Sequence, residues 1–278
     1  MTTFILKMVA LISMTLDHLR QFNPDFPIWF SWVGRIAAPI FLFCTVQAFI
    51  HTKNRKKLLL RLYLANVVMG ITDFCLGVSN NFIGALFVLT TILWIIEILK
   101  NNKKKGFLLL SIFILYQLVI TVICYYTPFI IDSDSNVYLF ASIFIVLLAF
   151  EGGFATLYVL LGVIIYLCND NKIKLAVGYS AFCVVYFIIT TTNIVLRVTS
   201  QLYTMNFEKA SDIVEIACQL LCIGPMDTGG NFLTENYNWM MIFALPFILA
   251  YNKRKGKDCK WLFYIYYPLH IILFSLIF

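Results

Sequence analysis

Long apolar stretches alternate with short polar connections along almost the whole chain. The apolar segments cover residues 4–22, 28–50, 58–78, 82–99, 107–128, 137–150, 153–168, 174–196, 239–251 and 261–278. Most of them approach or exceed the ~20 residues that a helix needs to cross a hydrocarbon core of ~30 Å. The pattern therefore predicts an all-α, polytopic membrane helical bundle. No soluble domain interrupts it, so residues 1–278 are expected to form a single transmembrane domain.

Basic residues concentrate in four of the connections and predict the topology. These connections are 51–61, 100–105, 169–174 and 252–260. The positive-inside rule places all four in the cytoplasm, which requires that one apolar segment does not cross. Segment 137–150 is short for a crossing helix and ends at Glu151-Gly152-Gly153, so we expect it to be re-entrant or interfacial. About nine crossings follow, with the N-terminus cytoplasmic and the C-terminus extracytoplasmic.

The first apolar segment and the long connection 197–238 carry further expectations. The first apolar segment lacks a small-residue cleavage site and contains Asp17 and His18, which predicts a retained helix rather than a signal peptide. The long connection 197–238 is expected to be an extracytoplasmic loop of the same domain. Within it, Ser211-Asp212 predicts the start of an amphipathic helix over 213–221. That helix would either act as a lid or acceptor-docking element, or pack the loop onto the membrane surface.

Composition narrows the class of protein. Hydrophobic residues make up 61% of the chain and charged residues only 13%, whereas soluble domains have about 25% charged residues. The net charge of +7 comes from clusters between apolar segments, so orientation explains it better than nucleic-acid binding. The eight cysteines form no Cys-x-x-Cys pair, and no His-Glu-x-x-His, Gly-x-Ser-x-Gly or phosphate-binding glycine loop is present. We expect no metal, no nucleic-acid partner and no motif-based hydrolase or ATPase.

Four ionisable residues inside apolar segments are the strongest candidates for function. They are Asp17, His18, Arg35 and His270. Such groups cost a few kcal/mol or more in lipid, so their presence is a functional hypothesis by default. At ~1.5 Å per residue, His18 is expected near the outer end of its helix and His270 nearer the middle of the membrane. Asp73 and Glu151 are weaker candidates, because both could lie at the water interface.

Asp17 is predicted to pair with Arg35 on the next helix. Neighbouring helix positions are ~100° apart, so Asp17 does not face the histidine that follows it. Gly34 and Ala38 form a small-xxx-small pair, which allows the first two helices to approach closely. Pro39 is expected to bend the second helix just below this site. The alternative is that the Asp17–Arg35 pair is only a buried structural strut.

The chemistry of these residues leaves three functions open. The unperturbed pKa of histidine is near 6.5, which suits a base that takes a proton from a nucleophile, and histidine can also carry an acyl group. A membrane acyltransferase is therefore one hypothesis. A proton-coupled small-molecule transporter could use the same polar groups, although no internal repeat typical of carriers is evident. A non-catalytic membrane assembly factor is the third.

Several stretches of the sequence resemble the TraX family, integral membrane proteins that include a pilin N-acetylase. The resemblance is carried by Leu6–His18, by Val33–Phe41, by His51–Lys57, by Ala244-Leu245-Pro246-Phe247, by Tyr251-Asn252 and by Tyr264–His270. These stretches cover the first quarter and the last tenth of the chain. Family members often carry Asp-Tyr-Gly where this chain has Glu151-Gly152-Gly153, so no role is carried over to Glu151.

The resemblance implies transfer of an acetyl group from acetyl-CoA to an amine or hydroxyl of an exported protein, peptide or glycan. The location it implies is the bacterial cytoplasmic membrane. His18 would be the general base or a transient acyl carrier, and Arg35 would stabilise the oxyanion or hold Asp17. His270 would be a second polar contact near the thioester. The residues expected to contact acetyl-CoA are Lys53, Arg55, Lys56 and Tyr267.

Overall fold

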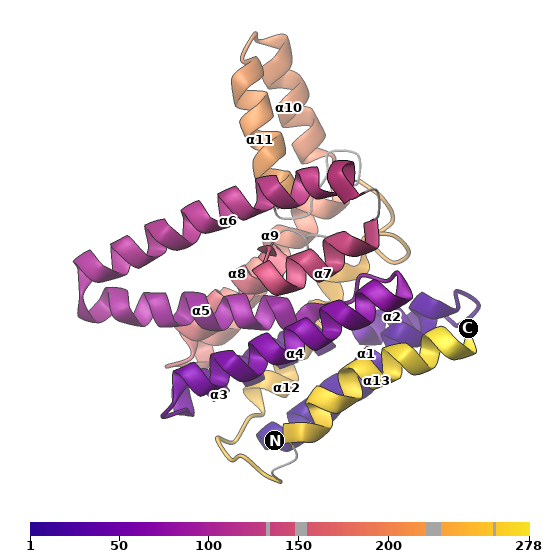
Figure 1. Cartoon of the computed structure of the whole chain (residues 1–278). Helices are drawn as coiled ribbons and strands as arrows, with labels where there is room; N and C mark the ends of the chain where they lie inside the picture. The colour runs from indigo at the N-terminus through magenta and orange to yellow at the C-terminus, as the bar shows by residue number, and fades with distance from the viewer. Residues whose placement is uncertain (132–133, 148–154, 221–228, 258–259) are drawn as a thin grey trace.

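The computed structural model describes residues 1–131, 134–147, 155–220, 229–257 and 260–278, and the regular elements in this part of the chain are helices (Figure 1). The elements are α1 (Thr3–Phe22), α2 (Trp29–Gly34), α3 (Ala37–His51), α4 (Arg55–Leu76), α5 (Phe82–Asn101), α6 (Lys103–Ile131), α7 (Asp134–Phe144), α8 (Ala155–Cys168), α9 (Lys172–Thr191), α10 (Ile194–Thr204), α11 (Glu208–Leu220), the 3-10 helix η3 (Tyr237–Ala244), α12 (Leu245–Leu249) and α13 (Lys260–Ile277). No strand occurs in these ranges. The all-α prediction is confirmed.

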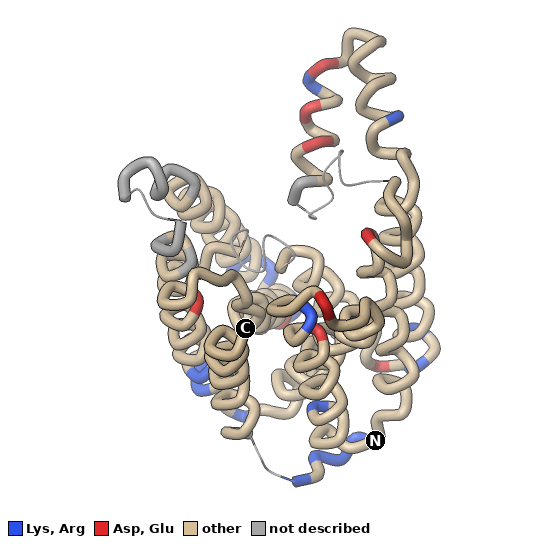
Figure 2. Tube along the Cα trace, turned by 90° about the vertical axis from the view of Figure 1, so that its right-hand side faces the viewer, with Lys and Arg blue, Asp and Glu red and all other residues tan. Residues whose placement is uncertain are grey.

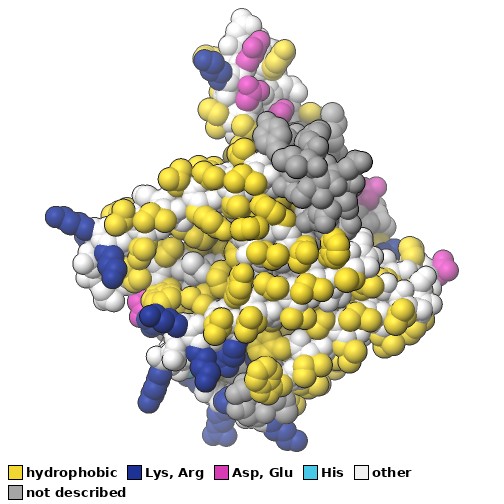
Figure 3. Space-filling model, in the orientation of Figure 1, with side chains coloured by type: hydrophobic (Ala, Val, Ile, Leu, Met, Phe, Trp, Pro, Cys, Tyr) yellow, Lys and Arg dark blue, Asp and Glu magenta, His cyan; other side chains and the backbone are white. Residues whose placement is uncertain are grey.

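Within the described residues, five helical stretches are long and apolar enough to cross a membrane. They are Trp29–His51, Arg55–Leu76, Phe82–Asn101, Lys103–Cys124 and Lys172–Thr191. Hydrophobic side chains cover the face formed by α4, α6 and α13, and Lys and Arg lie at its margin (Figure 3). Such a surface is typical of contact with lipid. Nine crossings would also require α1, α8, the η3–α12 stretch and α13, so that number stays a prediction.

The second apolar segment is two helices rather than one. Proline has no backbone N–H, so Pro39 cannot donate a hydrogen bond to the carbonyl of Arg35, four residues earlier. The chain turns at Arg35 and Ile36, between α2 and α3. The predicted bend at Pro39 is therefore corrected to a break on its N-terminal side. This break places Arg35 at an irregular point inside an apolar element.

The N-terminus is tied to the connection that precedes α13. The backbone N–H groups of Thr3 and Phe4 donate to the carbonyls of Arg254 and Lys255, at 2.9 and 3.1 Å. Gly256 lies beside this pairing with a φ of +74°, a conformation that favours glycine. The start of α1 and the connection 252–257 therefore lie at the same end of the bundle.

The other basic connections meet at that end as well. Lys172 at the start of α9 donates to the carbonyl of Leu249 at 2.8 Å, next to the connection 252–257. Gln47 in α3 donates to Asn169 at 2.6 Å, which joins the end of α3 to the connection 169–174. Lys and Arg gather accordingly toward one end of the trace (Figure 2). We call this the basic end, formed by 51–61, 100–105, 169–174 and 252–257.

An ion pair joins the remaining two basic connections. Arg55 at the start of α4 contacts Glu97 near the end of α5 at 2.6 Å. Lys100, one turn further on, lies over the ring of Tyr166 in α8, with Nζ 5.1 Å from the ring centroid and so within cation–π range. These contacts hold the ends of α4, α5 and α8 together at the basic end.

Helices α1 and α13 run parallel and side by side (Figure 1). Thr15 and Tyr266 share a hydrogen bond of 2.8 Å between their hydroxyls. Further along, the rings of Phe22 and Phe274 meet edge to face at 6.1 Å between centroids. Since both partners advance along the chain together, the two helices point in the same direction, away from the basic end.

The segment 137–150 corresponds in part to α7, which is short. Its 11 residues rise about 16 Å, well below the ~30 Å of a hydrocarbon core. Ile145 has a φ of 56° and ends the helix. The side chain of Gln117 in α6 donates to the carbonyl of Ile145 at 2.9 Å and accepts from the N–H of Leu147 at 3.1 Å. The C-terminal end of α7 is thus fixed by α6, which suits a re-entrant segment. Residues 148–150 and Glu151 lie outside the described part of the chain.

A helical hairpin of α10 and α11 projects away from the bundle (Figure 1) and carries several acidic residues (Figure 2). The segment predicted to be apolar up to residue 196 breaks after Thr191, and α10 begins at Ile194. The amphipathic helix expected from Ser211 begins earlier, at Glu208. The predicted start is wrong because the hydroxyl of Ser211 donates to the carbonyl of Thr199 at 3.2 Å and joins the two helices instead of capping one.

Candidate functional site

Arg35 is held at the break between α2 and α3 by three partners. Its Nη2 forms an ion pair with the carboxylate of Asp17 in α1, its Nη1 donates to Asn238 Oδ1 at 3.0 Å, and its Nε donates to the carbonyl of Ser31 at 3.3 Å. The side chains of Arg35 and Asp17 are only 21% and 18% exposed. The predicted Asp17–Arg35 pair is confirmed. A buried cation with this many partners is fixed in one orientation.

The close approach of α1 and α2 that the sequence predicted is also confirmed. A Cβ atom added to Gly34 would overlap the Cβ and carboxyl atoms of Asp17. Glycine is therefore required here by space, because its backbone conformation is helical. This contact brings the Asp17 carboxylate against the start of the break at Arg35.

Two neighbours of Arg35 were not found from the sequence. The ring of Tyr237 lies 5.5 Å from the guanidinium carbon, within cation–π range. Asn238 accepts from Arg35 and donates to the hydroxyl of Tyr186 in α9 at 3.5 Å. Neither residue carries a charge, so neither shows the unfavourable burial that drew attention to Asp17. Their only signal is their position directly before the apolar segment 239–251.

His18 and His270 form a hydrogen-bonded pair. His18 Nδ1 and His270 Nε2 are 2.7 Å apart, and the rings stack at 5.0 Å with an interplanar angle of 6°. Both residues are buried. The expectation that His270 lies deeper than His18 is wrong. His18 is near the end of α1, and His270 is near the middle of α13. The connection 252–257 pairs with the N-terminus, so α13 begins further along the bundle than α1 does. The middle of α13 therefore lies at the same level as the end of α1.

The hydrogen bonds assign the protons of this pair. His270 Nδ1 lies 2.9 Å from the carbonyl oxygen of Tyr266, which can only accept, so His270 Nδ1 carries a proton. In neutral His270 the Nε2 atom then has a lone pair and accepts from His18 Nδ1–H. The second nitrogen of His18, Nε2, is left with a lone pair. His270 therefore orients His18 and sets its tautomer, as the third member does in a catalytic triad.

A polar cavity of about 70 Å³ joins the two pairs. It is lined by Met14, Asp17, His18, Gly34, Arg35, Ala37, Ala38, Phe41, Phe82, Tyr158 and Tyr267. Tyr267 is positioned by its hydroxyl, which donates to the carbonyl of Asn80 at 2.7 Å and accepts from the N–H of Phe82 at 3.4 Å. A histidine, a guanidinium and two tyrosines thus line one small space inside an apolar bundle. This arrangement suits proton transfer and stabilisation of a developing negative charge.

The remaining predicted residues lie elsewhere. Lys53 and Lys56 are exposed at the basic end, and Arg55 is engaged by Glu97. None of these lines the polar cavity. Asp73 is buried near the end of α4, where its carboxylate accepts from the N–H of Asn80 at 3.3 Å and so shapes the following turn. Among the described residues, no group of three or more His, Cys, Asp and Glu side chains is placed to hold a metal ion.

Comparison with known proteins places this geometry in a family. The family described as TraX protein matches residues 3–278, nearly the whole chain. A shorter stretch is similar to the protein named probable fimbrial assembly protein FimC, serogroup H1, of Dichelobacter nodosus, with 34% identity over 71 residues. That alignment covers 24% of this chain and 29% of the relative. No solved structure matches the chain. Because the match extends from one end of the bundle to the other, the chain belongs to the TraX protein family.

Proposed function

We propose that this membrane protein is an acetyltransferase that moves an acetyl group from acetyl-CoA to an amine or hydroxyl of an exported acceptor. The observation that carries the proposal is the hydrogen bond between His18 and His270, which leaves a lone pair on Nε2 of His18, a residue that lines the polar cavity together with Arg35. A base, its orienting partner and a fixed cation are the parts that acyl transfer needs. Both His18 and Arg35 line the polar cavity, and His270 contacts His18 directly.

The transfer proceeds as follows. The acceptor nitrogen or oxygen attacks the carbonyl carbon of the thioester, and His18 Nε2 takes the proton that the acceptor loses. Arg35 stabilises the negative charge that develops on the carbonyl oxygen. The C–S bond then breaks, and the imidazolium of His18 returns the proton to the sulfur. The products are the acetylated acceptor and CoA, and His18 is restored to its starting state.

His270 is a positioning residue in this mechanism. It contacts His18 and the carbonyl of Tyr266. Its hydrogen bond keeps the His18 proton on Nδ1 and so leaves Nε2 able to accept a proton. Asp17 has a similar indirect part, because it fixes the guanidinium of Arg35 against α1.

The topology that accompanies the proposal has nine crossings and a cytoplasmic N-terminus. The basic end then faces the cytoplasm, as the positive-inside rule requires, and acetyl-CoA is available there. The α10–α11 hairpin and the acceptor lie on the extracytoplasmic side of the bacterial cytoplasmic membrane. The relative from Dichelobacter nodosus is named a probable fimbrial assembly protein, and this name supports an exported acceptor. The acceptor would then be a pilin, a peptide or a glycan.

The same name favours a second candidate, a non-catalytic role in the assembly of a surface appendage. The variant His18→Ala distinguishes the acetyltransferase from the assembly factor. An assembly factor does not need a base at the polar cavity, so its function should survive this substitution. A transporter that uses the buried polar groups would show substrate flux in proteoliposomes without release of CoA.

The test uses purified protein with acetyl-CoA labelled in the acetyl group and an extract of exported material as acceptor. Release of the CoA thiol and labelling of the acceptor are measured together. His18→Ala is expected to lower the rate by about 10²–10⁴, the usual contribution of a general base. The control is Ile12→Ala, an exposed position on the same helix, which should keep the wild-type rate. An unchanged rate in His18→Ala would refute the assignment of the base.

A further inference from the structure

The basic end contains a cavity of about 470 Å³ with a strongly cationic wall. Its cationic lining residues are Lys7, Arg61, Lys253, Lys255 and Lys257, and His51 lies beside them. No Asp or Glu is among the residues that line it, all of which belong to the described part of the chain. The wall is assembled from α1, α4 and the connection 252–257, which are far apart in sequence. Such a site suits a ligand with several negative charges, because several cations that line one concave wall attract anions.

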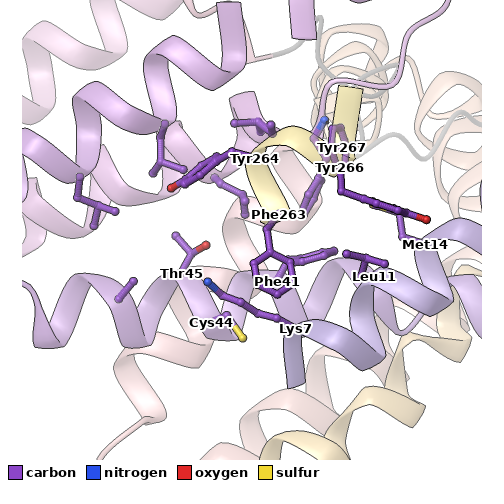
Figure 4. Close-up of a pocket in the computed structure, with 16 residues that line it drawn as sticks. Lys7, Leu11, Met14, Phe41, Cys44, Thr45, Phe263, Tyr264, Tyr266 and Tyr267 are labelled. Atoms are coloured by element: carbon purple, nitrogen blue, oxygen red, sulfur yellow. Dashed lines mark hydrogen bonds between the residues drawn. The ribbon is translucent and has the colours of Figure 1, made fainter. Parts of the chain in front are cut away.

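A narrower apolar cavity of about 100 Å³ continues from it into the bundle. The residues shared with the cationic cavity are Lys7, Cys44, Ala48, Leu58, Phe263 and Tyr264. The residues shared with the polar cavity at His18 are Met14, Phe41, Phe82 and Tyr267. We call this apolar cavity the neck. Side chains of α1, α3 and α13 line it, among them Lys7, Phe41 and Phe263 (Figure 4). The three cavities therefore follow one another from the basic end to His18.

We propose that this line of cavities is the binding site of the acyl-CoA donor. The phosphates of its nucleotide lie in the cationic cavity, its pantetheine arm occupies the neck, and its thioester reaches the polar cavity. The inference rests on the proposed acetyl transfer and assigns the phosphates of the donor to cationic residues that the sequence did not single out as a binding site. It replaces Lys53 and Lys56, which lie on the outer surface of the basic end, with the lysines of the connection 252–257.

The lengths agree with this assignment. Lys7 and His18 are eleven residues apart on α1, which corresponds to about 16 Å along the helix. The arm of CoA has about thirteen bonds between its diphosphate and its sulfur, and an extended chain that advances ~3.6 Å per three bonds spans about 16 Å. A diphosphate held near Lys7 therefore places the thioester at His18.

The chemistry of each cavity matches the part of the donor assigned to it. Lysine and arginine bind phosphates through charge-assisted hydrogen bonds, and Arg61 can engage two oxygens at once. The neck is lined by apolar and aromatic side chains such as Phe41 and Phe263, which suit the dimethyl and methylene groups of the arm. Of the three cavities, only the polar cavity is lined by His18, the proposed base. The donor would thus enter from the basic end and present its acetyl group to the opposite side.

The first test measures binding of CoA and of 3′,5′-ADP, its nucleotide part, to the purified protein. The double variant Lys255→Glu/Lys257→Glu should weaken binding of both ligands by roughly tenfold or more, since each change replaces attraction by repulsion. Lys103→Glu/Lys104→Glu is the matched control: it changes the net charge equally, and both lysines are exposed at the basic end without lining the cavities. Equal losses in the two double variants would overturn the assignment.

The second test blocks the neck. Ala48 lies where the cationic cavity meets the neck and is exposed, so Ala48→Trp fills the passage without entering the core. This variant should keep binding of 3′,5′-ADP within about twofold and lose at least tenfold in binding of CoA and in acetyl transfer. Ile12→Trp, at an exposed position of α1 outside the three cavities, controls for the added side chain. Full transfer activity in Ala48→Trp would overturn the route.

Failure of the donor site and failure of the enzymatic function give different results. His18→Ala should bind CoA like the wild-type protein and lose transfer. If transfer depends on His18 but the cationic and neck variants bind CoA normally, the function stands and the site is wrong. If CoA binds at the site but no acceptor is acetylated and no thiol is released, the enzymatic function is wrong.

Discussion

The orienting role of His270 leads to a prediction that separates a hydrogen bond from mere packing. His270→Ala removes the acceptor of His18 Nδ1–H, which is 2.7 Å away inside the bundle. Leaving a buried donor unsatisfied costs about 1–3 kcal/mol. His18 avoids this cost by moving its proton to Nε2 or by turning its ring, and in either case the lone pair of Nε2 is lost or displaced.

The expected loss of rate follows from that cost. Since 1.36 kcal/mol corresponds to a factor of ten, 1–3 kcal/mol lowers kcat by roughly 5-fold to 150-fold. KM for acetyl-CoA should change little, because His270 does not line the donor cavities. The matched variant is His270→Gln, whose side-chain oxygen can accept from His18 Nδ1–H. It should recover most of the rate, to within roughly threefold of wild type if the acceptor is what matters.

The assay is the initial rate of thiol release at saturating acetyl-CoA, with thermal unfolding measured on the same samples in detergent. Equal rates in the alanine and glutamine variants would refute the reasoning, because the hydrogen bond would then not account for the loss. A wild-type rate in both would remove His270 from the mechanism altogether. A loss of rate that follows a loss of folded protein would indicate packing instead.

Three further predictions concern Arg35 and the topology. Gly34→Ala should destabilise the fold by about 1–3 kcal/mol, seen as a lower thermal midpoint, because its Cβ would overlap Asp17; an unchanged midpoint would contradict the observed contact. Asn238→Ala removes a hydrogen bond to a charged group, typically 1.5–3 kcal/mol, and should slow acetyl transfer by at least roughly tenfold with the fold retained; Asn238→Asp is the comparison, since it keeps an acceptor for Arg35. A reporter inserted after Asn171 should read cytoplasmic, and an external signal would mean that segment 137–150 crosses.

Several features could be predicted from the sequence because their causes are local. The all-α bundle follows from the length of the apolar segments and from the scarcity of charge. The pair of Asp17 and Arg35 could be expected because the two residues lie on consecutive helices, one of them with a glycine at the contact. The interruption of the second helix was indicated by Pro39, although its position was set by the carbonyl four residues earlier.

Only the tertiary structure decided which distant residues meet. The pairing of His18 with His270 depends on where α13 starts along α1, and that start is set by backbone hydrogen bonds between residues 1–4 and the connection 252–257. The same folding back brings Lys255 and Lys257 beside α1 and α4 to line one cavity. Asn238 and Arg35, which are 203 residues apart in the sequence, also meet only in the folded bundle. The sequence determines which groups are costly to bury, because that cost belongs to each residue alone. The position of each helix along the bundle decides which side chains meet, and that position arises from the packing and connections of the whole bundle.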